Sequence, residues 1–162
     1  RLSCLRNDRL WPKHELQQSL YASMSRELCI RSARDGVTLT LSNFVSEGVA
    51  SISDSFLVEV KAYDLRVEAR ASTFMADDLG QFFTSLANDW RGWQGERTWA
   101  TLEGEFELTA TSDPLGHVRL AYFIRPPHTG LNWELRGSLE LEAGQLESLA
   151  LDAQAAWNSN AS

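Results

Sequence analysis

Residues 65–93 read LRVEARASTFMADDLGQFFTSLANDWRGW, and the spacing of their apolar side chains changes partway along. The first part alternates apolar and polar residues, which is typical of a strand with one buried face. The second part places apolar residues at helical spacing, which predicts an amphipathic helix that continues through both of its tryptophans. Asp77 and Asp78 suit the start of that helix, and Gly92 suits its end. Its apolar face comprises Leu79, Phe82, Phe83, Leu86, Trp90 and Trp93.

The sequence on both sides of this segment returns to the alternating pattern. Strands are predicted before it at 28–33, 37–42 and 56–60, and after it at 105–110, 118–124 and 131–141. A second amphipathic helix is predicted at 146–157. Because the strands come in runs joined by short turns, they should pair antiparallel. We therefore predict an α+β fold of order ββββ-α-βββ-α, with an antiparallel sheet of about seven strands and both helices packed on one face.

Composition narrows the possible partners. The chain has 162 residues, of which 43% are hydrophobic and 23% charged, with a net charge of −7. These values are typical of a globular protein. An acidic chain repels phosphate backbones, so we expect no nucleic-acid partner, whereas a basic protein partner would suit the charge. No apolar run reaches the roughly 20 residues that span a bilayer, so we expect no membrane segment.

The ends of the chain differ from its middle. Residues 1–23 carry four basic and two acidic side chains, whereas the rest of the chain is strongly acidic. We predict that 1–23 form a leader or a short docked helix; in the alternative, this segment is not native and the protein starts at Met24. Residues 24–157 are expected to form a single α+β domain, and 158–162 a polar tail.

Two cysteines, Cys4 and Cys29, are present. They could pair, but the apolar stretch around Cys29 favours a buried free thiol. Proteins that are not secreted seldom keep disulfides, so a cytoplasmic location is the expectation that goes with this interpretation.

A Trp-rich segment suggests a family. Residues 89–93 read DWRGW, and they are followed by Gly95-Glu96-Arg97, by Trp99 and by the Leu102-Glu103-Gly104 and Gly116-His117-Val118 triplets. This pattern resembles a bacterial, actinomycete-type family of small proteins, the domain of unknown function 6228, from about residue 37 to residue 157. The resemblance implies no activity, cofactor or site residue, but it supports the domain limits and a bacterial cytoplasmic setting.

The tryptophans supply the candidate binding residues. Trp90 and Trp93 continue the apolar face of the first predicted helix, which favours core packing. Trp99 lies beyond that helix and is expected to be the exposed ring, with Arg91 and Arg97 able to stack on such rings. The candidate binding site therefore comprises Trp99, Arg97, Arg91, Glu96 and His117.

The titratable residues show no catalytic or metal-binding motif. Glu103, Glu105 and Glu107 share one side of a strand, which favours a solvated face over a cation site. His117 is the first candidate for a titrating site residue, although a histidine at a turn usually makes only a local hydrogen bond. The sequence has no metal-ligand spacing and no nucleophile motif, so we predict no catalytic residue, no metal and no cofactor.

The hairpin around 112–116 allows a prediction of register. A five-residue turn would set Thr111 opposite His117, Leu108 opposite Leu120 and Glu103 opposite Arg125. In that register Glu103 and His117 lie far apart on one sheet face, which argues against an enzyme that uses both residues.

Three functions remain open. The first is a non-catalytic protein-interaction domain, by analogy with bacterial immunity proteins that neutralise toxins. The second is a small-ligand-binding domain with a pocket between the helices and the sheet, near Trp99 and His117. The third is an enzyme that uses Glu103 and His117. A deep apolar pocket would favour a ligand, whereas an exposed aromatic patch would favour a protein partner.

Overall fold

The computed structural model describes residues 27–45, 55–127, 130 and 132–158. The element order is β1 (Leu28–Arg31), β2 (Thr38–Val45), β3 (Ser55–Ala62), β4 (Leu65–Ser72), α2 (Leu79–Asn88), β5 (Glu96–Ala100), β6 (Phe106–Ser112), β7 (Val118–Ile124), β8 (Leu135–Leu141) and α3 (Ala143–Asn158). The chain thus passes twice through the same order, four strands followed by one helix.

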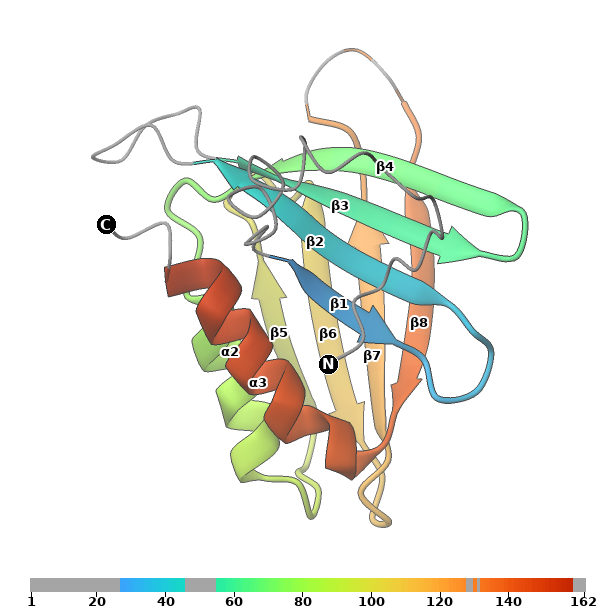
Figure 1. Cartoon of the computed structure of the whole chain (residues 1–162), viewed down its shortest axis with the longest axis vertical. Coiled ribbons are helices and arrows are strands. Elements are labelled where there is room, and N and C mark those ends of the chain that lie inside the picture. The colour runs from blue at the N-terminus through green and yellow to red at the C-terminus, as the bar shows by residue number, and fades with distance from the viewer. Residues whose placement is uncertain (1–26, 46–54, 128–129, 131, 159–162) are drawn as a thin grey trace, which may run out of the picture.

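The strands form two sheets rather than one. β1 to β4 make the first antiparallel sheet and β5 to β8 the second, each with its strands in chain order. Figure 1 shows the strands of the two sheets running in crossed directions. The predicted α+β class and antiparallel pairing are confirmed, but the single sheet of about seven strands is wrong. The prediction also placed both helices on one face of a single sheet. Because the strands form two sheets, that part of the prediction does not apply to this fold.

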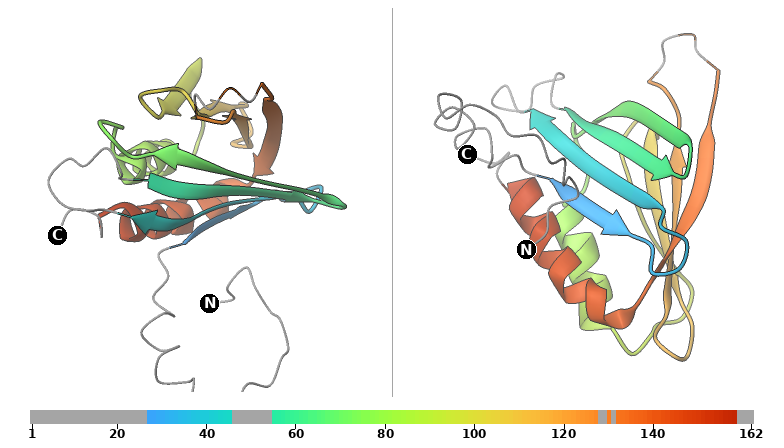
Figure 2. Two further views of the ribbon diagram at one scale, coloured as in Figure 1. Left: turned by 90° about the horizontal axis from the view of Figure 1, so that it is seen from above. Right: turned by 45° about the vertical axis from the view of Figure 1, so that its right-hand side comes forward.

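The helices pair with each other and reach different sheets. α2 packs along α3, as both views in Figure 2 show, and α3 contacts β1 and β2 whereas α2 contacts β5. At the crossing, Gly80 of α2 lies so close to α3 that an added Cβ would stand 2.9 Å from the Cα of Gln154. A side chain at position 80 would therefore push the helices apart.

One aromatic cluster joins both sheets and α3. Phe56 of β3 contacts the rings of Trp99 on β5, Phe106 on β6 and Trp157 on α3, with centroid separations of 6.0–6.5 Å. These residues belong to a continuous core formed by the inward faces of both sheets and both helices. Edge-to-face ring contacts of this kind stabilise a core beyond the area that they bury.

β5 is the strand that the sequence pattern did not predict. Only one of its residues, Trp99, is a buried apolar side chain. Arg97, on the same side, directs its guanidinium to the end of α2, where it donates to the Ser85 carbonyl oxygen at 2.7 Å. A strand with a single apolar anchor lacks the repeated alternation by which strands are identified.

The β6–β7 register also differs from the prediction. Leu108 pairs with Tyr122 and Phe106 with Ile124, a shift of two residues that keeps every side chain on its predicted face. The turn is tighter than expected because Asp113 pairs with His117 and Gly116 takes a positive φ of 83°. This geometry is typical of a three-residue hairpin loop.

Cys29 corrects another expectation. Cys29 is half-buried and disulfide-bonded, not a buried free thiol. The other cysteine, Cys4, lies outside the described residues, as do the predicted leader 1–23 and Met24. The argument from a free thiol to a cytoplasmic location is therefore lost. Among the helices of the described residues, none is long and apolar enough to cross a membrane.

Candidate functional site

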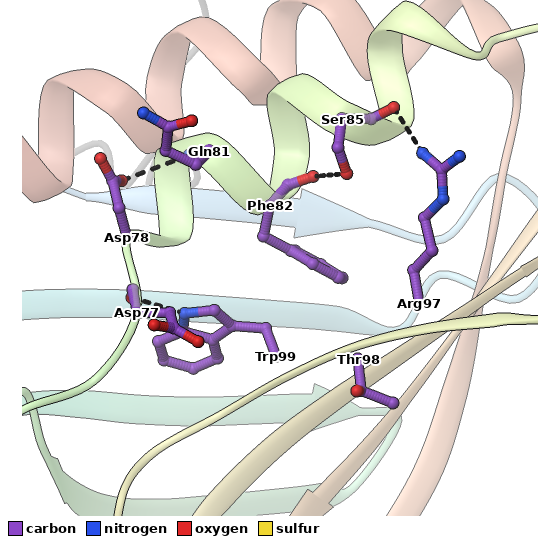
Figure 3. Close-up of a pocket in the computed structure, with 8 residues that line it drawn as sticks. All are labelled: Asp77, Asp78, Gln81, Phe82, Ser85, Arg97, Thr98 and Trp99. Atoms are coloured by element: carbon purple, nitrogen blue, oxygen red, sulfur yellow. Dashed lines mark hydrogen bonds between the residues drawn. The ribbon is translucent and has the colours of Figure 1, made fainter.

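An open groove of about 680 Å³ runs between α2 and β5. Figure 3 shows its lining, which comes from the loop before α2, from one side of α2 and from β5. We call this the α2–β5 groove. Its lining residues are Asp77, Asp78, Gln81, Phe82, Ser85, Arg97, Thr98 and Trp99.

The acidic end of the groove is fixed by the start of α2. Asp78 is the N-cap of that helix, and its Oδ1 accepts from the amides of Gly80 at 2.7 Å and Gln81 at 3.2 Å. The neighbouring Asp77 is held by its backbone, because its carbonyl oxygen accepts from the indole Nε1 of Trp99 at 2.7 Å. The capping motif therefore places two adjacent carboxylate residues on the groove rim.

The opposite end of the groove carries Arg97. Its guanidinium donates to the Ser85 carbonyl oxygen and, at 2.5 Å, to the Asp89 carboxylate. It also stacks over the ring of Trp93 at 4.7 Å. Arg97 thus stabilises the end of α2, where a cation suits the helix dipole, and its charge is balanced by Asp89.

The groove does not enclose a small molecule. Trp99 is only 3% exposed and Phe82 8% exposed, so the rings of the floor belong to the core and offer little surface to a ligand. Trp99 is therefore not the exposed ring that the sequence predicted. A binding pocket usually buries most of its ligand against apolar walls.

Among the tryptophans of the described residues, Trp90 is the most exposed. α2 ends at Asn88, so Trp90 leaves the apolar face of the helix and is 52% exposed. The Arg91 guanidinium stacks over its ring at 4.8 Å from the ring centroid. Trp93 remains half-buried against the core, and its indole Nε1 is buried without a hydrogen-bond partner in the described structure.

Trp90 lies in a loop that touches the β6–β7 turn. A Cβ on Gly92 would lie 3.0 Å from the Asp113 carbonyl oxygen, and one on Gly116 would lie 3.0 Å from the Trp90 carbonyl oxygen. Leu115, at the apex of that turn, is 82% exposed. We call residues 89–93 and 113–117 the tip. It presents two large apolar side chains beside an arginine.

His117 holds the tip turn through electrostatic contacts. Its Nδ1 lies 2.9 Å from Oδ2 of Asp113, and its Nε2 lies 3.8 Å from Oε2 of Glu142, just before α3. The hydrogen bond that the His117 ring donates to the Asp113 carboxylate raises the pKa of His117 and lowers the pKa of Asp113. His117 thus acts locally, as a turn histidine usually does.

The predicted site residues divide between these two places. Arg97 and Trp99 line the groove and Glu96 begins β5 beside it, whereas Arg91 and His117 belong to the tip. Trp99 is level with Tyr122 in the sheet, five residues from His117 or roughly 17 Å. The structure therefore does not bring all five residues to one site.

The glutamate prediction holds only in part. Glu103 is exposed, but Glu105 is buried, with only 5% of its surface exposed. Its carboxylate accepts from the Thr101 hydroxyl at 2.6 Å and from the Ser72 amide at 3.3 Å, which joins β4 to the turn after β5. It lines a second groove of about 510 Å³. Nothing in the alternating pattern distinguishes Glu105 from its neighbours, so sequence reasoning missed this contact.

The pair proposed for catalysis is separated. Arg125 bonds the backbone of Glu105 at one end of the β6–β7 ladder, and His117 pairs with Asp113 at the other. The eight residue steps from Glu105 to Asp113 span about 26 Å. Glu103 and His117 therefore cannot share a catalytic centre. In the described residues no group of three or more His, Cys, Asp or Glu side chains could hold a metal ion.

Comparison with known proteins yields a fold and a family. A solved structure described as "Crystal structures of trypanosoma bruciei MRP1/MRP2" is similar with a TM-score of 0.51 and 10% identity, over 95% of this chain and 97% of that chain. At this identity the likeness shows the fold alone. No curated protein sequence matches the chain. The family described as "Family of unknown function (DUF6228)" matches residues 30–160, and the chain belongs to that family.

Proposed function

We propose that this chain is a non-catalytic protein-interaction domain that binds its partner through the tip. The observation that carries the proposal is Trp90, a half-exposed tryptophan stacked by Arg91 in a loop that contacts the turn bearing the highly exposed Leu115. Tryptophan and arginine are the residues that most often dominate the energy of an interface. The tip thus supplies the exposed aromatic patch that distinguishes a protein partner from an enclosed ligand.

The charge of the domain supports a basic partner. The chain carries a net charge of −7, and the exposed Glu142 lies beside the tip residue His117. Complementary charge speeds encounter and selects against acidic partners. A basic toxin that this domain neutralises would be one partner of this kind, and the identity of the bound protein tests that narrower proposal.

Affinity capture with matched tryptophan variants tests the proposal. Trp90→Ala removes the tip ring, whereas Trp133→Ala removes another partly exposed tryptophan, near the start of β8 at the opposite end of the second sheet. We expect at least one protein to be captured by the wild type and by Trp133→Ala but not by Trp90→Ala. For the purified partner, Trp90→Ala should weaken binding at least tenfold, as truncation of a central interface residue does. Equal capture by all three proteins would refute the proposal.

A further inference from the structure

The edges of the two sheets differ in how their backbone groups are satisfied. In an antiparallel edge strand, every second residue directs its N–H and C=O away from the sheet. The hydrogen bond from the Thr101 amide to the Phe106 carbonyl oxygen shows which residues of β5 direct their backbone groups toward β6 and which direct them outward. By that alternation Arg97 and Trp99 bond to β6, and Glu96, Thr98 and Ala100 direct their backbone groups outward.

The other three edge strands each have an outward group bonded within the chain. On β8, the Glu140 carbonyl oxygen accepts from the Ala33 amide at 2.7 Å. On β1, the Arg31 carbonyl oxygen accepts from the Gln145 side chain at 3.2 Å. On β4, the Ser72 amide donates to Glu105. Each contact satisfies an outward group of its strand, so each of these three edges is partly closed to pairing with another chain.

β5 has no such protection within the part of the chain that the structure describes. No hydrogen bond there satisfies the outward backbone groups of Glu96, Thr98 or Ala100. The α2–β5 groove lies beside this edge, since Arg97, Thr98 and Trp99 line it, and Figure 3 shows the groove between the strand and the helix. Five strand residues span roughly 17 Å, enough to pair with a short extended segment.

The charges around the edge indicate what that segment carries. Asp77 and Asp78 stand on the groove rim, and the exposed Glu96 begins the strand. Of the described residues that line the groove, Arg97 alone is basic, and Asp89 already neutralises it. A segment with lysine or arginine at alternate positions complements these three carboxylates.

We propose that β5 receives an extended basic segment of the protein partner as an added strand of the second sheet. Main-chain hydrogen bonds to Glu96, Thr98 and Ala100 supply affinity, and the carboxylates select basic side chains. This inference rests on the proposed protein-interaction function and extends it, because β5 begins three residues after the tip loop. The partner would contact the tip with one part and β5 with another.

The test uses a defined probe, a nine-residue peptide of alternating lysine and threonine, capped at both ends, and its glutamate counterpart. Titration into the isotope-labelled chain is followed by the amide signals in NMR spectra. We expect saturable shifts at Glu96, Thr98 and Ala100 with the lysine peptide and slower hydrogen exchange at the Thr98 amide. The glutamate peptide should leave these signals unchanged.

Two variants locate the interaction. Thr98→Pro removes one outward N–H, which an edge strand tolerates, and should weaken the lysine peptide about fivefold. Ser138→Pro makes the matching change on the outer edge of β8 and should leave affinity unchanged. Glu96→Lys keeps the backbone and should weaken the lysine peptide while favouring the glutamate peptide, so it decides the case where Thr98→Pro fails to fold.

Several outcomes would overturn the inference. These are the absence of saturable shifts at millimolar peptide, equal binding to wild type and Thr98→Pro, or shifts confined to β8. A wild-type dimer that Thr98→Pro dissociates would identify a second copy as the occupant instead. If Trp90→Ala abolishes partner capture while Thr98→Pro does not, the proposed function stands and the strand addition fails. The reverse pattern keeps the strand addition and refutes the tip.

Discussion

Trp99 and Trp90 lie nine positions apart in the chain and occupy opposite environments. Trp99 is 3% exposed and packs against rings from β3, β6 and α3, whereas Trp90 is 52% exposed and contacts Arg91. Their hydrophobicity is the same, so the difference comes from the backbone. α2 ends before Trp90 and β5 turns Trp99 inward, and those two boundaries decide which ring stabilises the fold and which remains free for a partner.

Removal of the two rings should therefore have unequal effects on stability. We expect Trp99→Ala to lower the free energy of unfolding by about 3–5 kcal/mol, because a large core side chain leaves a cavity. Trp90→Ala should change it by about 0.5 kcal/mol, as exposed positions do. Chemical denaturation of both variants measures the difference. Similar large losses would mean that Trp90 is also part of the core.

The contact between α2 and α3 is buried, as Trp99 is, so a change there should also affect stability. Gly80→Ala would place its Cβ 2.8 Å from Cγ of Gln154 and 2.9 Å from its Cα, so we expect a loss of about 1–3 kcal/mol from overpacking. Gly144→Ala in α3 meets nothing within 4 Å and should be neutral or slightly stabilising, since alanine favours the helix. Thermal melting compares the two. Equal melting temperatures would show that the helices separate at little cost.

The sequence predicted the elements that have repeated apolar positions. The strands around Val58, Val67, Leu108 and Leu120 and the helices at Phe83 and Ala153 all have a buried face, and the pattern identifies them. β5 has one apolar anchor and was missed, so one sheet was predicted where two exist. The division into two sheets depends on long-range packing around Phe56, which no local spacing encodes.

The candidate site was predicted less well than the fold. Residues 89–99, which supply most of the predicted site residues, contain both the tip loop and the groove strand. The exposed and buried tryptophans were exchanged, because the apolar spacing continues through Trp90 although the helix ends at Asn88. The predicted pocket set His117 near Trp99, because the sequence pattern did not predict that Trp99 lies on a strand of its own, β5. The edge of β5 could not be identified, since free backbone groups depend on the neighbours of a strand and not on its own sequence.

The N-cap of α2 gives a smaller test on the groove side. Asp78→Ala removes the side-chain acceptor of the Gly80 and Gln81 amides, and we expect a loss of about 1 kcal/mol. Asp77→Ala is the matched control, because Asp77 contacts Trp99 through its backbone carbonyl and should change stability less. Denaturant titration separates the two effects. If Asp77→Ala costs as much, the carboxylates stabilise α2 by charge rather than by capping.

The smallest expected effect concerns the tip, where exposed charges are screened by solvent. The bond to Asp113 raises the pKa of His117 above its ordinary value of 6.5. Protonated His117 is thus favoured in the folded state, and its stabilising contribution is fully present below pH 6.5 and lost as pH rises through the raised pKa. The pKa of Asp113 is lowered below 3.8, so its contribution is present above that value and lost as pH falls through the lowered pKa.

The His117→Gln variant should therefore differ most from the wild type between about pH 4 and 6.5, and less at pH 8 and above, where the imidazole is neutral. Melting temperatures across this range test the profile, and the histidine signal that disappears in His117→Gln gives the pKa directly by NMR. A pKa at or below 6.5, or a stability difference that grows with pH, would show that the contact to Asp113 does not order the tip.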